Sequence, residues 1–473
     1  MQKITINPVT RIEGHAKITI YVDDEGNVSD SKFHVTQLRG FEKFCEGRPY
    51  TEMPSLTART CGICPVSHLI TASKACDEIL AVSIPKTAKN LRRVIHLAQM
   101  VQSHALSFFY LSSPDFLLGM DSEPSQRNIF NLMKTHPDVV ADGVKLRSFG
   151  QKVIEKLAGK RIHGGWIVPG GVSHKLERET RDDILSQIPE LIKIAKKHLD
   201  NFKRESSKFT QEIQSFANFP TLFMGLVDES GKLKFYDGKL RVVDSTGKIV
   251  KDQIEGKDYQ KYISEQVESD TYLKSPYYKP LGYEKGMYRV GTLARLNVAD
   301  SLGTALADDE LAEFKAIERG AVSSSFYYHQ ARLIELLFSL EKLQKLLSSN
   351  EILDSHIRAR AEVNRLEGIG LAEAPRGTLI HHYKVDEQGL VNYANLIIAT
   401  GNNNLAMNKG VKQVASHFIN GKEITEGALN RVEAVIRAFD PCLSCSTHAI
   451  GKMPLDISLV DSKGKIIDKK LRS

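Results

Sequence analysis

Cysteine and long apolar runs are both scarce in this chain, and each scarcity argues against a class of protein. Only six of the 473 residues are cysteine, which fits a reducing cytosol better than a disulfide-rich secreted protein. No stretch of about 18 consecutive apolar residues occurs, so no transmembrane helix is expected. The N-terminus has no apolar run of the kind found in signal peptides. The sequence therefore predicts a cytoplasmic protein without a membrane span.

A large excess of charge of one sign is also missing. The chain has 64 basic and 57 acidic residues, a net charge of +7, and these are spread without long like-charge blocks. No stripe of lysine and arginine is interleaved with aromatic residues, which argues against binding to nucleic acid. Hydrophobic residues make up 41% of the chain and charged residues 26%, as in ordinary globular proteins.

Four of the six cysteines nevertheless form two CxxC pairs at opposite ends of the chain. The pairs are Cys61 with Cys64 and Cys442 with Cys445. Each pair is followed by a histidine, His68 or His448. Thiolates select soft or borderline metals such as zinc, nickel, copper(I) and iron clusters. The four sulfurs can hold one such centre if the fold brings the two ends together, whereas Cys45 and Cys76 stand alone and are expected to be buried thiols.

Two other uses of CxxC pairs remain open at this point. One is a structural zinc site. In zinc ribbons the pairs are usually about 15–20 residues apart, because they close a small domain, whereas Cys442 lies 378 positions after Cys64. The other is a disulfide pair or a thioredoxin-like redox site, although no compact βαβ unit surrounds either pair. Of these two alternatives, structural zinc is the stronger.

The residues that flank the cysteines resemble the two signature motifs of NiFe hydrogenase large subunits. These motifs are Arg59-x-Cys-Gly-x-Cys-x-x-x-His68 and Asp440-Pro-Cys-x-x-Cys-x-x-His448. Further segments resemble the family's other boxes in the same order: Arg11 to His15, Arg39 to Glu42, Gly164 to Val172, and Glu373 to Gly377. The resemblance runs from about residue 5 to residue 473. It implies a hydrogenase, an oxidoreductase that acts on dihydrogen.

Within that family the chain resembles the cytoplasmic branch. Residues 377–383 and 399–404 are similar to methanogen and NAD-linked enzymes. The nearest relatives are expected to be the methyl-viologen-reducing hydrogenases of methanogens, which supply electrons to heterodisulfide reductase in methanogenesis. One alternative is the large subunit of a deazaflavin- or NAD-reducing hydrogenase. Others are a zinc-stabilised scaffold and a non-catalytic relative similar to the quinone-binding subunit of respiratory complex I, although such relatives lack the four cysteines.

Dihydrogen is a very weak acid in water, so its cleavage needs a metal and a nearby base. By resemblance, the terminal nickel ligands are Cys61 and Cys442, and the ligands that bridge nickel to an iron with carbonyl and cyanide groups are Cys64 and Cys445. The resemblance also implies that Glu13 accepts the proton from the Cys442 sulfur, a role that suits a partly buried carboxylate. From the sequence alone, a salt bridge between Glu13 and Arg11 is the competing interpretation.

The same resemblance gives three more residues a role around the metals. It implies that Arg376 holds a fixed cation over the open metal position, that Asp440 orients Arg376, and that His68 donates to a bridging sulfur. Taken alone, Arg376 is a turn residue, Asp440 an N-cap and His68 a core histidine. Many membrane-bound relatives have an acidic residue on the first long helix where this chain has Ser103, so the charge network around Arg376 must differ.

The resemblance also implies a second metal site and a partner protein. Glu42, His448 and a backbone carbonyl near Leu396 resemble a hard-cation site for magnesium or iron. The chain has no cysteine set for an iron–sulfur cluster, and electrons that leave nickel need closely spaced centres. An iron–sulfur small subunit is therefore the implied partner, with further electron-transfer subunits beyond it.

Hydrophobic patterning predicts an α+β fold with a core of long helices. The predicted helices cover residues 86–110, 177–205 and 307–348. Pro189 is expected to kink or break the second of them. Alternation over residues 15–36 predicts a β-hairpin near the N-terminus, and short strand-like pieces over residues 225–290 predict a β-rich insertion. The glycines of Gly368-Ile369-Gly370 are expected in a turn rather than in a dinucleotide site.

We expect one large-subunit domain over residues 1–473. Its parts are an N-terminal sheet region (1–60), the first metal loop with helices (61–224), the insertion (225–290), helices with the second metal motif (291–448), and a C-terminal extension (449–473). In the family that this chain resembles, an endopeptidase commonly removes such an extension after nickel insertion. Its alternating apolar residues predict a hairpin that is added to the N-terminal sheet.

Overall fold

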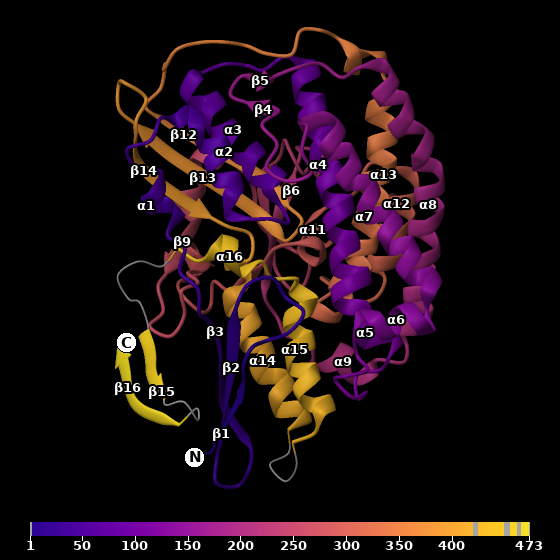
Figure 1. The fold of residues 1–473 in the computed structure, drawn as a ribbon, viewed down its shortest axis with the longest axis vertical. Helices are drawn as coiled ribbons and strands as arrows, with labels where there is room; N and C mark the ends of the chain where they lie inside the picture. Colours follow the sequence, from indigo (N-terminus) through magenta and orange to yellow (C-terminus); the bar gives the residue numbers. More distant parts are fainter. Residues whose placement is uncertain (1, 420–423, 449–454, 461–464, 473) are drawn as a thin grey trace.

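The computed structural model describes residues 2–419, 424–448, 455–460 and 465–472. Figure 1 shows a bundle of long helices, a group of sheets beside it, and an arm in which the N-terminal strands lie next to the last helices. Helices and sheets are both extensive, which confirms the α+β class predicted from the sequence. No helix among the described residues is long and apolar enough to cross a membrane.

The N-terminal segment forms an antiparallel three-stranded sheet. Its strands are β1 (Gln2–Ile6), β2 (Ala16–Val22) and β3 (Val28–Val35), in the order β1-β2-β3. Strands β2 and β3 are the predicted hairpin, which is confirmed, and Asp23 Oδ1 accepts a hydrogen bond from the Asn27 backbone N–H at 2.7 Å across the turn. Ile18 and Ile20 are fully buried, as the alternation requires.

Long helices form the largest core. They are α4 (Lys86–Ala105), α7 (Pro137–Ala158), α8 (Arg178–Ser206) and α13 (Tyr328–Leu347). Helix α4 contacts α7 and α13, and α13 contacts α8, and Figure 1 shows these helices side by side. A π-helical segment, Leu106–Ser112, extends α4. Helix α8 runs through Pro189 without the expected break, because Pro189 is exposed and water can bind the carbonyl that loses its partner.

The apolar repeat over residues 307–348 is not one helix, so that prediction was wrong. Helix α12 (Ala305–Lys315) ends well before α13 begins at Tyr328. Between them Gly320 has a φ of 92°, which an α-helix cannot contain. Val322 and Phe326 are fully buried in this connection. A buried loop therefore imitated the helical spacing of apolar residues.

Two sheets carry the middle of the chain. The insertion contributes β6 (Leu222–Val227), β7 (Lys239–Val243), β8 (Ile249–Ile254) and β11 (Tyr288–Arg289), in the order β11-β6-β7-β8. This confirms the β-rich insertion. The second sheet is antiparallel and contains β12 (Glu367–Ala374), β13 (Gly377–Val385) and β14 (Val391–Ile397). The turn between β12 and β13 carries Arg376.

Gly368 and Gly370 lie within β12, so the expected turn at these residues was wrong. Strand β12 packs against α3 (Pro65–Leu80). A Cβ atom at Gly370 would lie 1.8 Å from the Thr71 carbonyl oxygen, and one at Gly368 would lie 2.1 Å from the Ala75 carbonyl oxygen. Only glycine allows the strand and the helix to approach so closely. Helix α3, which begins directly after Cys64, is thereby held against the sheet that carries Arg376.

The last helices lie beside the N-terminal sheet. Helix α14 (Asn404–Phe418) packs on β3 and on α15 (Glu426–Phe439), and a short helix, α16 (Leu443–Ser446), follows. Strands β15 (Leu455–Val460) and β16 (Ile466–Arg472) form the predicted tail hairpin. The hairpin is a separate two-stranded sheet, so its predicted addition to the N-terminal sheet was wrong. The expected turn at residues 461–464 lies outside the described residues.

The remaining elements are short. The helices are α1 (Phe41–Cys45), α2 (Met53–Thr57), α5 (Ser113–Leu117), α6 (Ile129–Thr135), α9 (Thr210–Ser215), α10 (Tyr259–Tyr262) and α11 (Thr292–Val298). The strands are β4 (Ile167–Val168), β5 (Gly171–Val172), β9 (Ile263–Gln266) and β10 (Ser275–Tyr278).

Candidate metal centre

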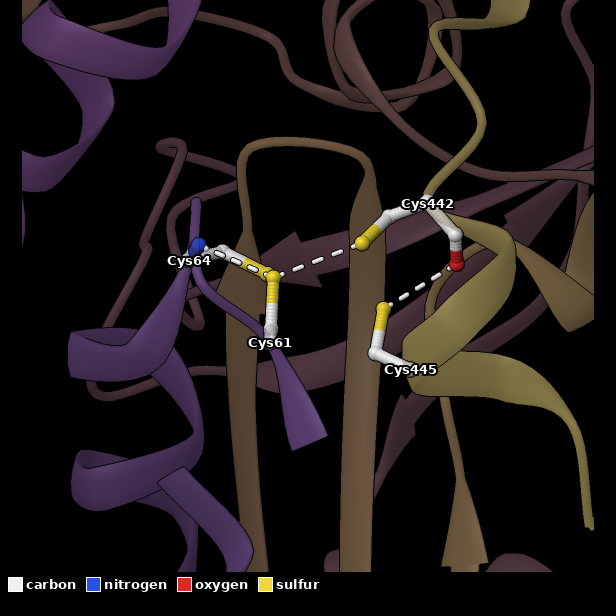
Figure 2. Close-up of side chains that lie close together, drawn as sticks. All are labelled: Cys61, Cys64, Cys442 and Cys445. Atoms are coloured by element: carbon white, nitrogen blue, oxygen red, sulfur yellow. Dashed lines mark hydrogen bonds between the residues drawn. The ribbon is translucent and has the colours of Figure 1, made fainter. Parts of the chain in front are cut away.

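The two CxxC pairs meet in the interior of the fold, as Figure 2 shows. The Cys61 Sγ atom lies 2.8 Å from Cys64 Sγ and 3.3 Å from Cys442 Sγ. The sulfurs of Cys61, Cys64, Cys442 and Cys445, which we call the cysteine cluster, all lie within 4.8 Å of one another and are buried. None of them forms a disulfide, so the disulfide alternative is wrong.

Short turns hold the first pair in place. Cys61 follows a 3-10 turn, Ala58–Thr60, and Cys64 is the cap residue in front of α3. The Cys61 sulfur accepts the backbone N–H groups of Ile63 at 3.3 Å and of Cys64 at 3.0 Å. Hydrogen bonds from Cys442, Cys445 and Cys61 lower the pKa of the Cys64 thiol well below its usual value. The cluster therefore favours at least one thiolate before any metal is considered.

The segment from Arg11 to His15 lies directly against the second cysteine pair. Glu13 and Cys442 form a parallel bridge, and the Leu443 N–H donates to the Glu13 backbone oxygen at 3.1 Å. The Glu13 side chain accepts the Ser444 N–H through Oε2 at 3.1 Å. Arg11 pairs with Asp115 instead, so the competing Arg11–Glu13 salt bridge was wrong. The Glu13 carboxylate is thus held by the backbone of the loop that carries Cys442.

Arg376 points from the β12–β13 turn toward the cysteine cluster. Its Nε donates to the Asp440 backbone oxygen at 2.7 Å, its Nη2 to Asp440 Oδ1 at 3.1 Å, and its Nη1 to Ser103 Oγ at 3.3 Å. Burial lowers the pKa of Arg376, but Asp440 and the thiols of the cluster raise it well above its usual value. A buried, charged guanidinium therefore lies beside the sulfurs. The hydroxyl of Ser103 accepts the hydrogen bond from the Arg376 Nη1 group that Asp440 does not bind.

Asp440 is held in a conformation that aims it at Arg376. It caps the C-terminus of α15 with a φ of 53°, in the left-handed region, so the N-cap alternative was wrong. Its backbone N–H donates to the Arg437 oxygen at 3.0 Å. Pro441 and Cys442 follow at once, so one backbone turn positions both the partner of Arg376 and a cluster sulfur.

A buried ion network clamps the turn that carries Arg376. Arg295 donates to both oxygens of Glu335 at 2.6 Å and to Glu373 Oε2 at 2.8 Å. The same guanidinium binds the backbone oxygens of Ala374 at 2.8 Å and Pro375 at 3.1 Å. All three charged side chains are fully buried. Sequence reasoning missed Arg295 and Glu335, because nothing in their local sequence links them to residues 373–375.

His68 lies in the interior beside the first pair. Its Nδ1 is 3.3 Å from Nε2 of His381, whose Nδ1 is 2.8 Å from the Tyr383 hydroxyl. His68 also contributes to lowering the pKa of the Cys64 thiol, after the larger effects of the other cysteines. It is thus a buried histidine that faces a cluster sulfur. Sequence reasoning did not identify His381 or Tyr383 as its partners.

The residues of the predicted second metal site are also brought together. The Leu396 N–H donates to Glu42 Oε1 at 2.9 Å, and the Phe41 N–H donates to His448 Nδ1 at 3.3 Å. Burial lowers the pKa of His448 to about 3, so its ring is neutral. Its Nδ1 accepts from Phe41 and its Nε2 donates to the Cys445 backbone oxygen at 3.0 Å, so a metal ligand role requires that one of these contacts is replaced. The Lys274 ammonium, which sequence reasoning missed, binds both oxygens of Glu42 at 2.9 and 3.0 Å. A cation at this site must share or replace that contact.

Four buried sulfurs without disulfides match the donor set of a soft-metal centre, and no other group of three or more metal-ligating side chains occurs among the described residues. This site differs from that of a zinc ribbon, in which the metal closes a small domain. Here a charged guanidinium lies beside the sulfurs, and 378 positions separate the two cysteine pairs. The fold and the site therefore define the class as a metalloenzyme with one thiolate-bound centre.

Comparison with known families decides which metalloenzyme this is. Residues 39–125 and 209–448 match the family described as nickel-dependent hydrogenase, and residues 3–38 match one described as HoxL-like. The chain belongs to the nickel-dependent hydrogenase family, and it is a hydrogenase, an oxidoreductase. The nickel-dependent family and the buried cluster together support a Ni–Fe centre. The zinc-scaffold and non-catalytic alternatives are therefore set aside.

Curated relatives match along the full chain. The beta chain of the NAD-reducing hydrogenase HoxS of Cupriavidus necator is 42% identical over 100% of both chains. A component of the F420-non-reducing hydrogenase vhc of Methanococcus voltae is 41% identical over 99% of both. The predicted relationship to methanogen enzymes is thus confirmed, and the NAD-reducing alternative has a relative of similar identity.

Solved structures show the same fold. The structure of an NAD+-reducing [NiFe]-hydrogenase in the H2-reduced state superposes with a TM-score of 0.92 at 42% identity and covers 95% of this chain and 100% of its own. The Ni-Fe-Se hydrogenase of Desulfovibrio vulgaris Hildenborough, at 24% identity and a TM-score of 0.77, covers 94% of this chain and 100% of its own and shares the fold. The hydrogenase large-subunit fold predicted from the sequence is confirmed.

Proposed function

We propose that this chain is the catalytic component that oxidises dihydrogen to protons and electrons at a Ni–Fe centre held by the cysteine cluster. One observation carries the proposal: four sulfurs from distant parts of the chain converge within 4.8 Å, beside a buried arginine that stays charged. In this proposal Cys61, Cys64, Cys442 and Cys445 would together hold the nickel and the iron of the centre. When bound, the centre would supply the metal sites for polarising and splitting dihydrogen.

The protein's own part is to hold charge and to move protons. Arg376 is a cation fixed by three hydrogen bonds, and it can stabilise negative charge that develops beside it without reorganising. Glu13 is bound to the loop that carries Cys442 and is only half-buried, so its carboxylate can accept a proton from the cluster side and release it outward. His68 is placed to donate to Cys64 and to tune the basicity of that sulfur.

We infer that Glu42, His448 and the backbone at Leu396 hold a second, hard cation, magnesium or iron. The support is that three segments come close: the backbone of Phe41, next to Glu42, donates to the His448 ring, and the Leu396 N–H donates to the Glu42 carboxylate. Carboxylate oxygen suits magnesium, and the imidazole makes iron a second candidate. The Lys274 ammonium then moves off at least one oxygen of Glu42 when the cation binds.

Electrons must leave this chain through another protein. Among the described residues, the cysteine cluster is the one group of cysteines close enough to bind a metal. We therefore propose that the partner is an iron–sulfur small subunit, in a complex located in the cytoplasm, with heterodisulfide reductase as the acceptor system. The support for that acceptor is the similarity to F420-non-reducing hydrogenases of methanogens. The 42% identity to an NAD-reducing hydrogenase supports NAD+ as the second candidate.

Anoxic purification of the native complex tests both the proposed metal centre and the proposed electron acceptor. We expect about one nickel per chain together with iron, an iron–sulfur protein that co-purifies, and dihydrogen-dependent reduction of methyl viologen. Zinc without nickel would overturn the proposed centre. Reduction of NAD+ by the same complex at a comparable rate would replace heterodisulfide reductase with the second candidate, and leave the centre itself supported.

A further inference from the structure

A buried chain of three side chains begins beside the cysteine cluster. His68 lies on α3, and His381 and Tyr383 lie on β13, which contacts α3. All three side chains are fully buried. Because His381 and Tyr383 are two residues apart on one strand, their side chains lie on the same face of the sheet. The chain therefore links a tyrosine on the sheet to the helix that begins directly after Cys64.

Each ring nitrogen along this chain has its own neighbour. His68 Nδ1 lies 3.3 Å from His381 Nε2, and His381 Nδ1 lies 2.8 Å from the Tyr383 hydroxyl oxygen. His68 Nε2 is buried and has no hydrogen-bond partner among the described residues. The His68 side chain nevertheless acts on the Cys64 thiol. Since Nδ1 is taken by His381, Nε2 is the nitrogen that is available to the Cys64 sulfur.

The hydrogens on the chain can be counted. Burial lowers the pKa of His381 well below its usual value, so the ring is neutral and carries one hydrogen. Burial raises the pKa of Tyr383 well above its usual value, so the hydroxyl keeps its hydrogen. A hydrogen bond between two ring nitrogens needs a hydrogen on one of them only. The chain therefore has two possible directions, and each tautomer in it reverses when the direction does.

A metal-bound sulfur selects one of these directions. A cysteine that binds a metal is deprotonated, so its sulfur can only accept a hydrogen bond. His68 must then carry its hydrogen on Nε2, which leaves Nδ1 to accept from His381 Nε2. His381 Nδ1 has to accept in turn, and the Tyr383 hydroxyl is the donor at that position. The direction that the sulfur requires is thus completed by the single hydrogen of Tyr383.

The Thr57 hydroxyl competes with His381 for that hydrogen. It acts on Tyr383, and it donates its own hydrogen to the Met53 backbone oxygen at 2.7 Å. Thr57 can therefore only accept from Tyr383. If Tyr383 donated to Thr57, the chain would reverse and His68 Nε2 would present a lone pair to the sulfur. Lone pairs on Nε2 and on a metal-bound sulfur repel each other, so a bound metal disfavours the reversed chain.

We propose that Tyr383 is a positioning residue of the metal centre: its hydroxyl donates to His381 and thereby holds His68 in the tautomer that donates from Nε2 to the Cys64 sulfur. The inference rests on the proposed function, because a metal-bound thiolate is what imposes this direction. An N–H group that points at a ligand sulfur stabilises the reduced, more negative state of a metal centre, and so raises its reduction potential. Tyr383 thus tunes that potential without touching a ligand.

Redox titration of the intact hydrogenase complex under anoxic conditions tests the proposal, with the electron paramagnetic resonance signal of nickel as the readout. Tyr383→Phe removes only the hydroxyl, so the chain no longer fixes one tautomer. Loss of one hydrogen bond changes such an equilibrium about 2- to 10-fold. We expect the midpoint potential of the nickel signal to move to a lower value than in the parent, with the nickel content unchanged.

Tyr259→Phe is the matched control, because it removes the same kind of contact from the same strand. The Tyr259 hydroxyl lies 3.0 Å from His382 Nδ1, and both side chains are buried. His382 follows His381 on β13, so its side chain lies on the opposite face of the sheet from that of His381. The control should therefore lose a similar amount of stability and keep the parent potential.

A double-mutant cycle shows whether Tyr383 acts through His381. His381→Leu should lower the potential by itself, and Tyr383→Phe should add no further shift in that background. An unchanged or higher potential in Tyr383→Phe would overturn the inference, and so would the same shift in Tyr259→Phe or a full additional shift in the double variant.

The parent complex separates this inference from the proposed function. A parent without a nickel signal defeats the proposed centre, and this inference with it. A parent that has the signal and oxidises dihydrogen, but whose potential does not respond to Tyr383→Phe, defeats the inference alone.

Discussion

Glu335→Gln is the sharpest test of how the Arg376 turn is held. Glu335 accepts two hydrogen bonds of 2.6 Å from Arg295 and lies 3.0 Å from His104 Nε2, and all three side chains are fully buried. Glutamine keeps the shape but loses the charge, and its NH2 group must face a donor of Arg295 or of His104. Arg295 then has Glu373 as its only carboxylate partner among the described residues.

The magnitude follows from the distances. At an effective dielectric constant of about 20, opposite charges 2.6 Å apart attract by about 6 kcal/mol before desolvation is counted. Removing one partner of a buried pair lowers the free energy of unfolding by about 3–5 kcal/mol. Unfolding entropy near 2.1 cal/mol/K per residue gives about 1 kcal/mol/K for a chain of this length, so the melting temperature should fall by about 3–5 °C.

Scanning calorimetry of the purified complex at one scan rate measures this fall. The control is Glu190→Gln, because Glu190 pairs with Lys145 at the surface, where its side chain is 63% exposed. An exposed pair contributes about 0.2–1 kcal/mol, so the control should melt within about 1 °C of the parent. If Glu335→Gln melts as close to the parent as the control does, the network is not what holds the turn.

Three further outcomes are expected. Arg376→Lys keeps the charge but cannot bind Asp440 and Ser103 together. The rate of methyl viologen reduction should therefore fall about 10²- to 10³-fold with nickel content unchanged. An undiminished rate would show that these hydrogen bonds of the guanidinium are unimportant. Glu13→Gln keeps an acceptor for the Ser444 N–H but cannot take up a proton, so turnover should fall about 10²- to 10⁴-fold, and a normal rate would remove Glu13 from the proton path. Burial lowers the pKa of His96 to about 3 and of His104 to about 4. Below about pH 6.5 the unfolded chain therefore binds more protons than the folded chain. The free energy of unfolding should fall between about pH 6.5 and 4, by up to about 1.4 kcal/mol per pH unit for each histidine. A melting temperature that stays constant over that range would show that these histidines are not held neutral by burial.

The cysteine cluster was accessible from the sequence because its chemistry is local. Each CxxC pair places two sulfurs on one turn, and the flanking residues Arg59, His68, Asp440 and His448 made the family resemblance specific. The hairpin β2–β3 was accessible for a similar reason, since strict alternation and a short polar turn are both readable in a few residues.

Long-range partners were not accessible. Nothing near Arg295 or Lys274 in the sequence indicates that the first holds the backbone of Ala374 and Pro375, or that the second neutralises Glu42. Gly370 was assigned to a turn because glycine has two uses, and only the packing of β12 on α3 shows which one applies. Likewise, the connection around Val322 was predicted to be helical because its apolar residues are buried at helix-like spacing, although its backbone is not helical.

The convergence of residues 61–64 with residues 442–445 also dictates an order of events during biosynthesis. Until residues 442–445 have left the ribosome, the early pair has no opposite pair to face, and the cysteine cluster cannot form. Closing a loop of 378 residues costs little more entropy than closing a far shorter one, because that cost grows only logarithmically with length. What delays the cluster is therefore translation and folding rather than chain entropy. Nickel loaded before that moment would meet two thiols, so a faithful insertion step has to wait until residues 442–445 are available.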